Sequence, residues 1–317
     1  MSAPHAPREP RDARDTFDAR QVQRAFSRAA GSYDEAAALQ REIEARLLES
    51  LDFWPAKHGD DHLPACVVDL GSGPGRGAAA MRGRWPKARV IAIDLALPML
   101  REARRRERWG VLARNPLRRG IDRICADARA LPLADGSVDV LFSNLCLQWI
   151  EDLPAVFAGF RRVMRPGALL MVSTFGPDTL HELRAAFAAG DDAPHVSPFA
   201  SIAQFGDALM QAGFRDPVLD RDTTVSHHAD LAALVRELRT LGATNALRTR
   251  RHTLTGKARL ARAEQAYAAE FADPSGLPAT WETITAMAWA PAHGAPIRQG
   301  GAEVASFPAS RVPIRRR

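Results

Sequence analysis

The stretch that decides the fold is Val67-Val68-Asp69-Leu70-Gly71-Ser72-Gly73-Pro74-Gly75. Its first four residues have the pattern of a buried strand, and glycines then alternate through a turn before a helix. Glycine has no Cβ, so such a turn allows a ligand to approach the backbone closely. The stretch therefore predicts a strand–turn–helix unit whose turn contacts a ligand.

Short apolar runs of the same kind recur along the chain, separated by helix-length segments. They occupy residues 90–93, 124–126, 138–142 and 169–172, and residues 215–225 are candidates for one or two further strands. Strands that alternate with helices form βαβ units, and continuously apolar strands are buried on both faces. We therefore predict an α/β fold with a doubly wound, Rossmann-like parallel sheet.

Helical periodicity flanks the predicted sheet. Apolar residues return at helical spacing between Val22 and Leu51, with a break near Gly31-Ser32, which predicts two amphipathic helices. After Gly176 the pattern is mainly helical. The expected organisation is a disordered tail over residues 1–16, an N-terminal helical lid over 17–60, the α/β domain over 61–225, a C-terminal helical cap over 226–291 and a disordered basic tail over 292–317.

The net charge of +6 is concentrated in two segments. Residues 101–123 hold nine Arg against three acidic residues, and residues 231–262 hold seven Arg and one Lys against one Glu. The rest of the chain is therefore net acidic. This distribution argues against a uniformly basic nucleic-acid-binding surface, and we expect no nucleic-acid partner.

Neither a membrane segment nor a metal site is expected. No run approaches the roughly 20 apolar residues that a membrane helix needs, and the N-terminus lacks the apolar core of a signal peptide. The three cysteines, Cys66, Cys125 and Cys146, are odd in number and are not at metal-ligand spacing. We expect reduced thiols in a cytoplasmic protein.

Acidic and amide side chains end the predicted strands that follow the glycine turn. Asp94 ends the second strand, where a carboxylate can accept hydrogen bonds from both hydroxyls of a ribose. Asp127-Ala128 ends the third strand, in position for an adenine edge, and Ser143-Asn144 ends the fourth. Each side chain also fits a local capping role, but together they predict one pocket at the carboxyl edge of the sheet.

A nicotinamide cofactor is disfavoured, although it uses the same fold and a similarly placed acid. The turn is Gly71-Ser72-Gly73-Pro74-Gly75 rather than G-x-G-x-x-G. Pro74 also removes an N–H group that a pyrophosphate would need.

The glycine turn, Asp94 and Asp127 together resemble those of the class I S-adenosylmethionine-dependent methyltransferases, over roughly residues 20–220. A narrower resemblance, to the malonyl-acyl carrier protein O-methyltransferases of biotin synthesis, covers about residues 20–290. It is carried by the segments 25–34, 143–149, 173–184, 194–196 and 241–245.

The resemblance implies an enzyme that methylates the free carboxyl of malonyl-acyl carrier protein, giving an ester that fatty-acid elongation enzymes accept. It implies S-adenosylmethionine as cofactor, with its parts divided among the strand ends. The methionine part would lie against Asp69, Gly71, Gly73 and Gly75, the ribose against Asp94 and Leu95, and the adenine against Asp127 and Ala128, with Asn144 nearby. Ser72 and Pro74 depart from the commoner G-C-G-T-G form, while the glycines nearest the ligand remain.

A malonyl carboxylate is already ionised at neutral pH, so no general base is expected. The protein should instead align the reacting atoms and exclude water. The candidate positioning residues are Arg28, Tyr33, Gln148, Trp149, His181 and Arg184, of which either arginine could pair bidentately with the carboxylate. We expect the acidic carrier protein to dock on the basic 231–262 segment, including Arg248, Arg250 and Arg251.

The sequence leaves three alternative functions to consider. A methyltransferase for a small acid or a quinone would share every cofactor residue. A nucleic-acid methyltransferase is disfavoured, because residues 144–147 lack the Asn-Pro-Pro-aromatic arrangement expected for a flipped base. A cofactor-binding subunit without catalysis is the third.

Overall fold

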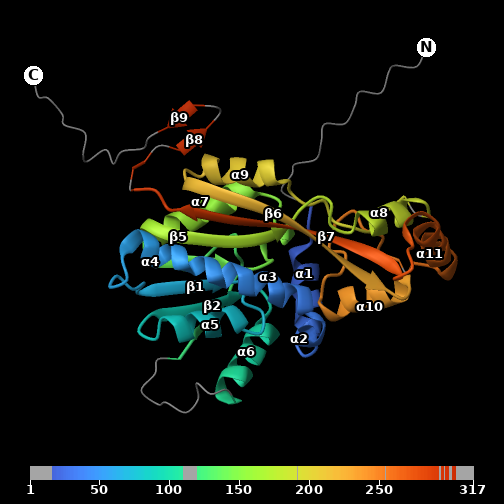
Figure 1. Ribbon diagram of the computed structural model, residues 1–317, viewed down its shortest axis with the longest axis horizontal. Coiled ribbons are helices and arrows are strands. Elements are labelled where there is room, and N and C mark those ends of the chain that lie inside the picture. The colour runs from blue at the N-terminus through green and yellow to red at the C-terminus, as the bar shows by residue number, and fades with distance from the viewer. Residues whose placement is uncertain are drawn as a thin grey trace, which may run out of the picture.

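A seven-stranded sheet in the order β3-β2-β1-β4-β5-β7-β6 runs through the molecule (Figure 1). This computed structural model describes residues 16–109, 120–190, 192–253, 255–292, 294–295, 297–299 and 302–304. β1 to β5 are parallel to one another, and β7 is antiparallel to both β5 and β6. The strands are β1 (Cys66–Leu70), β2 (Arg89–Asp94), β3 (Asp122–Cys125), β4 (Val138–Ser143), β5 (Met164–Phe175), β6 (Arg215–His228) and β7 (Leu277–Trp289).

Helices cover both faces of this sheet, which confirms the doubly wound α/β prediction. Leu47, Leu51 and Trp54 pack with Met81 and Trp85 on one face. Phe157, Phe160 and Phe205 pack on the other. The first face carries α3 (Ala38–Glu49), the 3-10 turn η2 (Ser50–Asp52), α4 (Phe53–His58) and α5 (Arg76–Arg84); the second carries α7 (Leu153–Val163) and α9 (Ile202–Gln211); α6 (Leu97–Trp109) follows β2.

The parallel register brings the strand ends to one edge. Leu70 at the end of β1 pairs with Ile93, and Asp94 at the end of β2 pairs with Cys125 at the end of β3. The loops that follow β1, β2, β3 and β4 therefore emerge side by side, as the sequence predicts. In the part of the chain that the structure describes, no helix is both long and apolar enough to cross a membrane.

The segment expected to be a helical cap over 226–291 differs in its last part. α10 (Leu231–Thr240) and α11 (Lys257–Phe271) are helices, but β7 then enters the main sheet between β5 and β6. The cap is thus an insertion between two long paired strands, and with α8 (His181–Ala188) it lies beyond the carboxyl edge (Figure 1). β7 is interrupted by Thr and Glu, yet nearly all of it is buried.

The lid begins with α1 (Ala19–Ala29) and the short α2 (Tyr33–Ala36). Directly before α1, Phe17 forms an antiparallel bridge with Leu247, and Asp18 N donates to Ala246 O at 2.8 Å. Arg250 also contacts the Asp18 carboxylate at 3.3 Å. These contacts, here called the latch, join the N-terminal lid to the segment that follows α10.

The expected disordered tails lie mostly outside the described residues, since residues 1–15 and 305–317 are not among them. Within the second tail, β8 (Ile297–Gln299) and β9 (Ala302–Val304) pair as a separate two-stranded sheet. That part of the tail therefore differs from the expectation.

Candidate functional site

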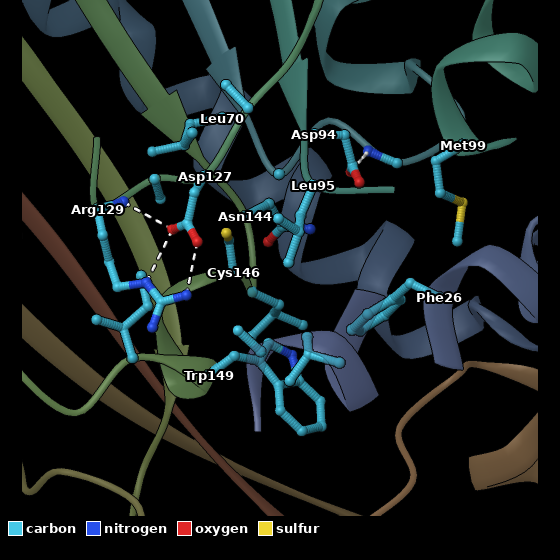
Figure 2. A pocket seen from close by; sticks show the side chains of 18 of the residues that line it. Phe26, Leu70, Asp94, Leu95, Met99, Asp127, Arg129, Asn144, Cys146 and Trp149 are labelled. Carbon is cyan, nitrogen blue, oxygen red and sulfur yellow. Dashed lines mark hydrogen bonds and ion pairs between the residues drawn. The ribbon is translucent and has the colours of Figure 1, made fainter. Parts of the chain in front are cut away.

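A cavity, here the first cavity, lies where the loops after β1, β2, β3 and β4 meet helix α1 (Figure 2). Asp94 and Asp127 stand on different sides of it, and Phe26 and Trp149 face it from the lid side. Of the residues predicted for the cofactor, those that line it are Gly71, Gly73, Asp94, Leu95, Asp127, Ala128 and Asn144.

The glycine turn is built as the sequence indicates, with left-handed backbone at Gly71, where φ is +70°. A Cβ at Gly71 would lie 2.6 Å from the Cβ of Cys146, so the loop after β1 packs directly on the loop after β4. Gly75, also left-handed, begins α5 and packs against Ala103 instead of lining the first cavity. Its requirement for glycine is therefore explained by packing.

Asp94 joins the ends of two strands. Its carboxylate accepts hydrogen bonds from Gly73 N at 2.9 Å and Ala96 N at 2.7 Å. Burial raises the pKa of Asp94 to about 6, and these two backbone donors limit the rise. The side chain is thus held in one orientation at the cavity wall, as a ribose-binding carboxylate must be.

Asp127 is paired with Arg129 at the wall of the first cavity. Arg129 donates to both of its oxygens, from Nε at 2.9 Å and from Nη2 at 2.6 Å (Figure 2). Burial by itself would raise the pKa of Asp127, but the hydrogen bonds from Arg129 outweigh it and lower the pKa. Arg129 thus keeps Asp127 ionised beside the expected adenine position.

Asn144 has a structural role that the sequence did not reveal. Its Oδ1 accepts from Ser173 Oγ at 2.7 Å, and its Nδ2 donates to Gln40 O of helix α3 at 3.0 Å. It therefore ties the end of β4 both to β5 and to the lid.

Asp69 lies deeper than predicted. It is 2% exposed, accepts from Ala78 N at 2.6 Å, and lines a smaller cavity beyond the glycine turn rather than the first cavity. Burial raises the pKa of Asp69, and the charge of Glu44 raises it further. This smaller cavity, here the third cavity, shares Tyr33, Gly71, Gly73 and Asn144 with the first.

A second cavity adjoins the first under the cap. The two share Phe26, Tyr33, Leu145 and Trp149, which form a common wall. Its remaining surface is largely apolar, with a few polar groups such as His195 and Thr244. A ligand in the first cavity and another in the second would meet at this wall.

Two buried hydrogen-bond donors line the second cavity, and one of them belongs to that wall. The indole nitrogen of Trp149 and Thr244 Oγ1, farther into the second cavity, are buried and have no partner among the described residues. Burial, followed by the charge of Asp94, raises the pKa of Tyr33 far above its ordinary value, so its phenol stays protonated. Gln148 also lines the second cavity, but its Nε2 already donates to Leu145 O at 2.7 Å.

Three predicted positioning residues line none of these cavities. Arg28 is exposed on α1, and His181 is exposed with Nδ1 3.1 Å from Asp178 O. Arg184 donates to Pro177 O and Thr179 O. Sequence reasoning missed His195, Thr244 and Asn245 as wall residues, although the segments 194–196 and 241–245 carried the family resemblance.

Known proteins resemble this chain at two levels, in the α/β domain alone and over almost the whole chain. A family model described as a methyltransferase domain matches residues 68–172. The YcgJ protein of Bacillus subtilis, a solved structure with 12% identity, has a TM-score of 0.53 and covers 78% of this chain and 99% of its own; it supports the fold alone.

Two curated relatives extend over almost the whole chain. One from Xylella fastidiosa (strain M23) is 55% identical over 301 residues, 95% of this chain and 98% of the relative. One from Laribacter hongkongensis (strain HLHK9) is 44% identical over 279 residues, 87% of this chain and 90% of the relative. Both are named malonyl-acyl carrier protein O-methyltransferase.

Proposed function

The chain belongs to the family of malonyl-acyl carrier protein O-methyltransferases, and on that premise we propose which of its residues serve each part of the reaction. It is an S-adenosylmethionine-dependent enzyme that transfers a methyl group to the free carboxyl of malonyl-acyl carrier protein. A small acid or a quinone, the alternative substrate, is not favoured by these relatives.

We propose that the first cavity holds the adenosine part of the cofactor. The residues fit this group, because Asp94 presents a buried, oriented carboxylate at a strand end, and Asp127 lies across the cavity from it. Gly71 lines both the first and the third cavity, and no larger residue fits there against Cys146. Leu95, Met99 and Ala128 supply apolar wall on which an adenine base can pack.

We propose that the malonyl group enters the second cavity and reaches the common wall. When bound, S-adenosylmethionine supplies a methyl group that a carboxylate oxygen attacks in line with the carbon–sulfur bond. The phenol of Tyr33 and the indole N–H of Trp149 lie at this wall and are suited to orient the carboxylate.

The absence of Arg and Lys from the described lining of the second cavity supports this arrangement. A guanidinium bonded bidentately to the carboxylate would hold its lone pairs and weaken it as a nucleophile. Neutral donors orient it without neutralising its charge, and the apolar walls exclude water. This replaces Arg28 and Arg184 in the proposed substrate site.

The carrier protein requires a separate surface. Arg250 is a poor choice within the 231–262 segment, because its side chain is 17% exposed and holds the latch through Asp18. Leu238 of α10 and Leu241 directly after it line the second cavity, and Arg236 and Arg239 of the same helix are exposed. We propose these two arginines as the docking residues for the acidic carrier.

We propose a cytoplasmic enzyme whose ester enters biotin synthesis, as the resemblance of segments such as 173–184 implies. We also propose that no nucleic acid is bound, because the positive charge is concentrated in two segments of an otherwise acidic chain and does not cover the surface evenly.

The observation that carries the proposal is the common wall of the first and second cavities. Labelled S-adenosylmethionine would be incubated with enzyme and malonyl-acyl carrier protein, and in parallel with malonyl-coenzyme A and free malonate. We expect a base-labile methyl ester, seen by intact mass, mainly on the carrier. Ester on free malonate alone would contradict the carrier assignment.

The role of Trp149 has a sharper test. Trp149→Phe keeps an aromatic ring against Phe17 and Phe26 but removes the N–H donor. We expect kcat to fall about tenfold with unchanged binding of S-adenosylhomocysteine. Tyr267→Phe is the control, since Tyr267 donates to Pro278 O away from both cavities and its variant should retain full kcat.

A further inference from the structure

Apolar side chains make up most of the wall of the second cavity, and a few polar side chains lie among them. Some of these polar groups are fully occupied within the protein. Thr179 Oγ1 donates to Glu282 O and accepts from Glu282 N, both at 3.1 Å. Asn245 Nδ2 donates to Pro194 O at 2.7 Å, and its Oδ1 accepts from Leu247 N at 3.0 Å. Buried polar atoms that lack such a partner are therefore candidates for contact with a ligand.

Gln148 presents one such atom, an acceptor. Its Nε2 donates to Leu145 O at 2.7 Å, which fixes the side-chain amide in one orientation. Its Oε1 is buried and has no hydrogen-bond partner in the described part of the chain. A buried carbonyl oxygen without a donor costs free energy, so this position favours a ligand that brings an N–H group. Gln40 Oε1 is also unpartnered there, but Gln40 borders the third cavity as well and is not specific to the second.

Thr244 presents a hydroxyl from the loop after α10. Gly242 in this loop has left-handed backbone, with φ of +74°, and a Cβ there would lie 3.2 Å from Ala25 O of α1. The loop thus packs closely on the lid, and Thr244 reaches the cavity wall. Its Oγ1 is buried and finds no partner among the residues that the structure describes. A hydroxyl can donate, so a carbonyl oxygen of a ligand would satisfy it.

The malonyl group alone cannot satisfy both atoms. Its carboxylate and its thioester carbonyl only accept hydrogen bonds, so neither can pair with Gln148 Oε1. In malonyl-acyl carrier protein the malonyl group is a thioester of a pantetheine arm, and the first polar group beyond the sulfur is a secondary amide. An amide offers one N–H donor and one carbonyl acceptor. This is the pattern that Gln148 Oε1 and Thr244 Oγ1 require.

We propose that the second cavity binds this first amide of the pantetheine arm, with Gln148 Oε1 accepting from its N–H and Thr244 Oγ1 donating to its carbonyl oxygen. The methylenes between the sulfur and the amide pack on the apolar wall. The inference rests on the proposed function, since it takes the malonyl group to the common wall. It adds that the enzyme recognises the arm that carries the acid, and not the acid and the carrier surface alone.

The test uses small malonyl thioesters, so that docking of the carrier protein plays no part. The thioesters of N-acetylcysteamine, 2-mercaptoethyl acetate and pentanethiol have arms of equal length. The first contains the amide, the second has an oxygen in place of the N–H, and the third lacks both polar groups. Methyl ester formation would be followed by mass spectrometry. We expect kcat/KM to be about tenfold higher for the first thioester than for either of the others.

Two variants separate the two contacts. Thr244→Val keeps the branched shape but removes the hydroxyl, so kcat/KM should fall about fivefold for the first two thioesters and not for the third. Gln148→Met removes the acceptor and should lower kcat/KM for the first thioester only. Thr240→Val is the matched control, because Thr240 lines neither cavity and donates to Arg236 O at 2.9 Å. It should change none of the three values, and all three variants should bind S-adenosylhomocysteine normally.

Equal kcat/KM for the three thioesters would overturn the inference and leave the proposed function in place. An equal loss on all three thioesters in Thr244→Val and Gln148→Met would also overturn it, and would assign these side chains to packing. So would methylation of malonyl-acyl carrier protein but of none of the thioesters, because recognition would then lie in the carrier protein. If the unaltered enzyme methylated neither the carrier-bound acid nor any thioester, the proposed function itself would fail.

Discussion

The floor and the roof of the proposed donor site are built in different ways. The floor is the carboxyl edge of the sheet, where the ends of three parallel strands hold Asp69, Gly71, Asp94 and Asp127. The roof is α1, α3 and the segment after α10, joined by the latch between residues 16–18 and 246–250. Because the latch closes over some 230 residues with few bonds, the roof should open far below the free energy of global unfolding. We therefore expect the floor to be formed before the cofactor binds, and the enclosure of the bound cofactor to depend on the roof.

The largest difference should appear between two glycines. Gly71→Ala forces a left-handed backbone and a clash with Cys146, so we expect a loss of about 4 kcal/mol in the free energy of unfolding. Gly31→Ala in the roof meets nothing within 4 Å and should change stability by less than about 0.5 kcal/mol. Urea denaturation measures both. Similar losses for the two variants would mean that the roof is as tightly packed as the floor.

The next effect concerns binding at the floor. Asp94→Asn removes the charged acceptor that we propose for both ribose hydroxyls, so we expect the Kd for S-adenosylhomocysteine to rise about a hundredfold. Asp122→Asn is the control, because Asp122 begins β3 and pairs with Arg89 away from the cavities. A small effect of Asp94→Asn would place the ribose elsewhere.

The same carboxylate gives the floor a pH dependence. Burial raises the pKa of Asp94 to about 6, so it binds a proton as the pH falls through that value. Affinity for 5′-methylthioadenosine, which lacks the amino-acid end, should therefore fall about tenfold from pH 7 to pH 5. Because the pKa is raised in the folded state, the same group's contribution to stability is lost as the pH rises from about 4 to about 6. Asp94→Asn should abolish both slopes, and their persistence would assign them to another group.

A smaller effect is expected at the roof. Asp18→Ala removes the cap of α1, which accepts from Gln21 N, and the partner of Arg250. We expect about a fivefold rise in the Kd for S-adenosylhomocysteine, through faster dissociation in stopped flow. Asp152→Ala removes the equivalent cap of α7 and should cost stability without changing dissociation. If dissociation were equally fast in both variants, the latch would have no special role.

The smallest effect should lie outside both regions. Reversing Arg236 and Arg239 to Glu should raise the KM for malonyl-acyl carrier protein about threefold at low salt, less at high salt, with kcat unchanged. Arg101 and Arg104 on α6 are exposed too, and their reversal is a control with the same change of charge. An equal rise of KM in the control would mean that the net charge of the protein, and not the position of these two arginines, causes the effect.

The difference between floor and roof also decides what the sequence could predict. Asp94 and Asp127 were predictable because each ends a short apolar strand, a local pattern that places it at the edge. Contacts such as Phe17 with Leu247 join distant segments and leave no local signal. β7 was missed for another reason: Thr and Ala dilute its apolar pattern, and it carries the buried Glu282, whose carboxylate accepts from Asp178 N at 2.7 Å.

The position of β7 has a consequence for how the chain is made. It lies between β5 and β6 in the sheet but follows both in sequence, after the 48 residues 229–276 that separate it from β6. On the ribosome, β5 and β6 must therefore wait with unpaired edges until residues 277–289 have emerged. Such edges attract other strands, so the nascent protein is most prone to aggregate in that interval. A chain whose synthesis stops before β7 lacks the strand that joins β5 to β6, so β6 cannot pair with the rest of the sheet.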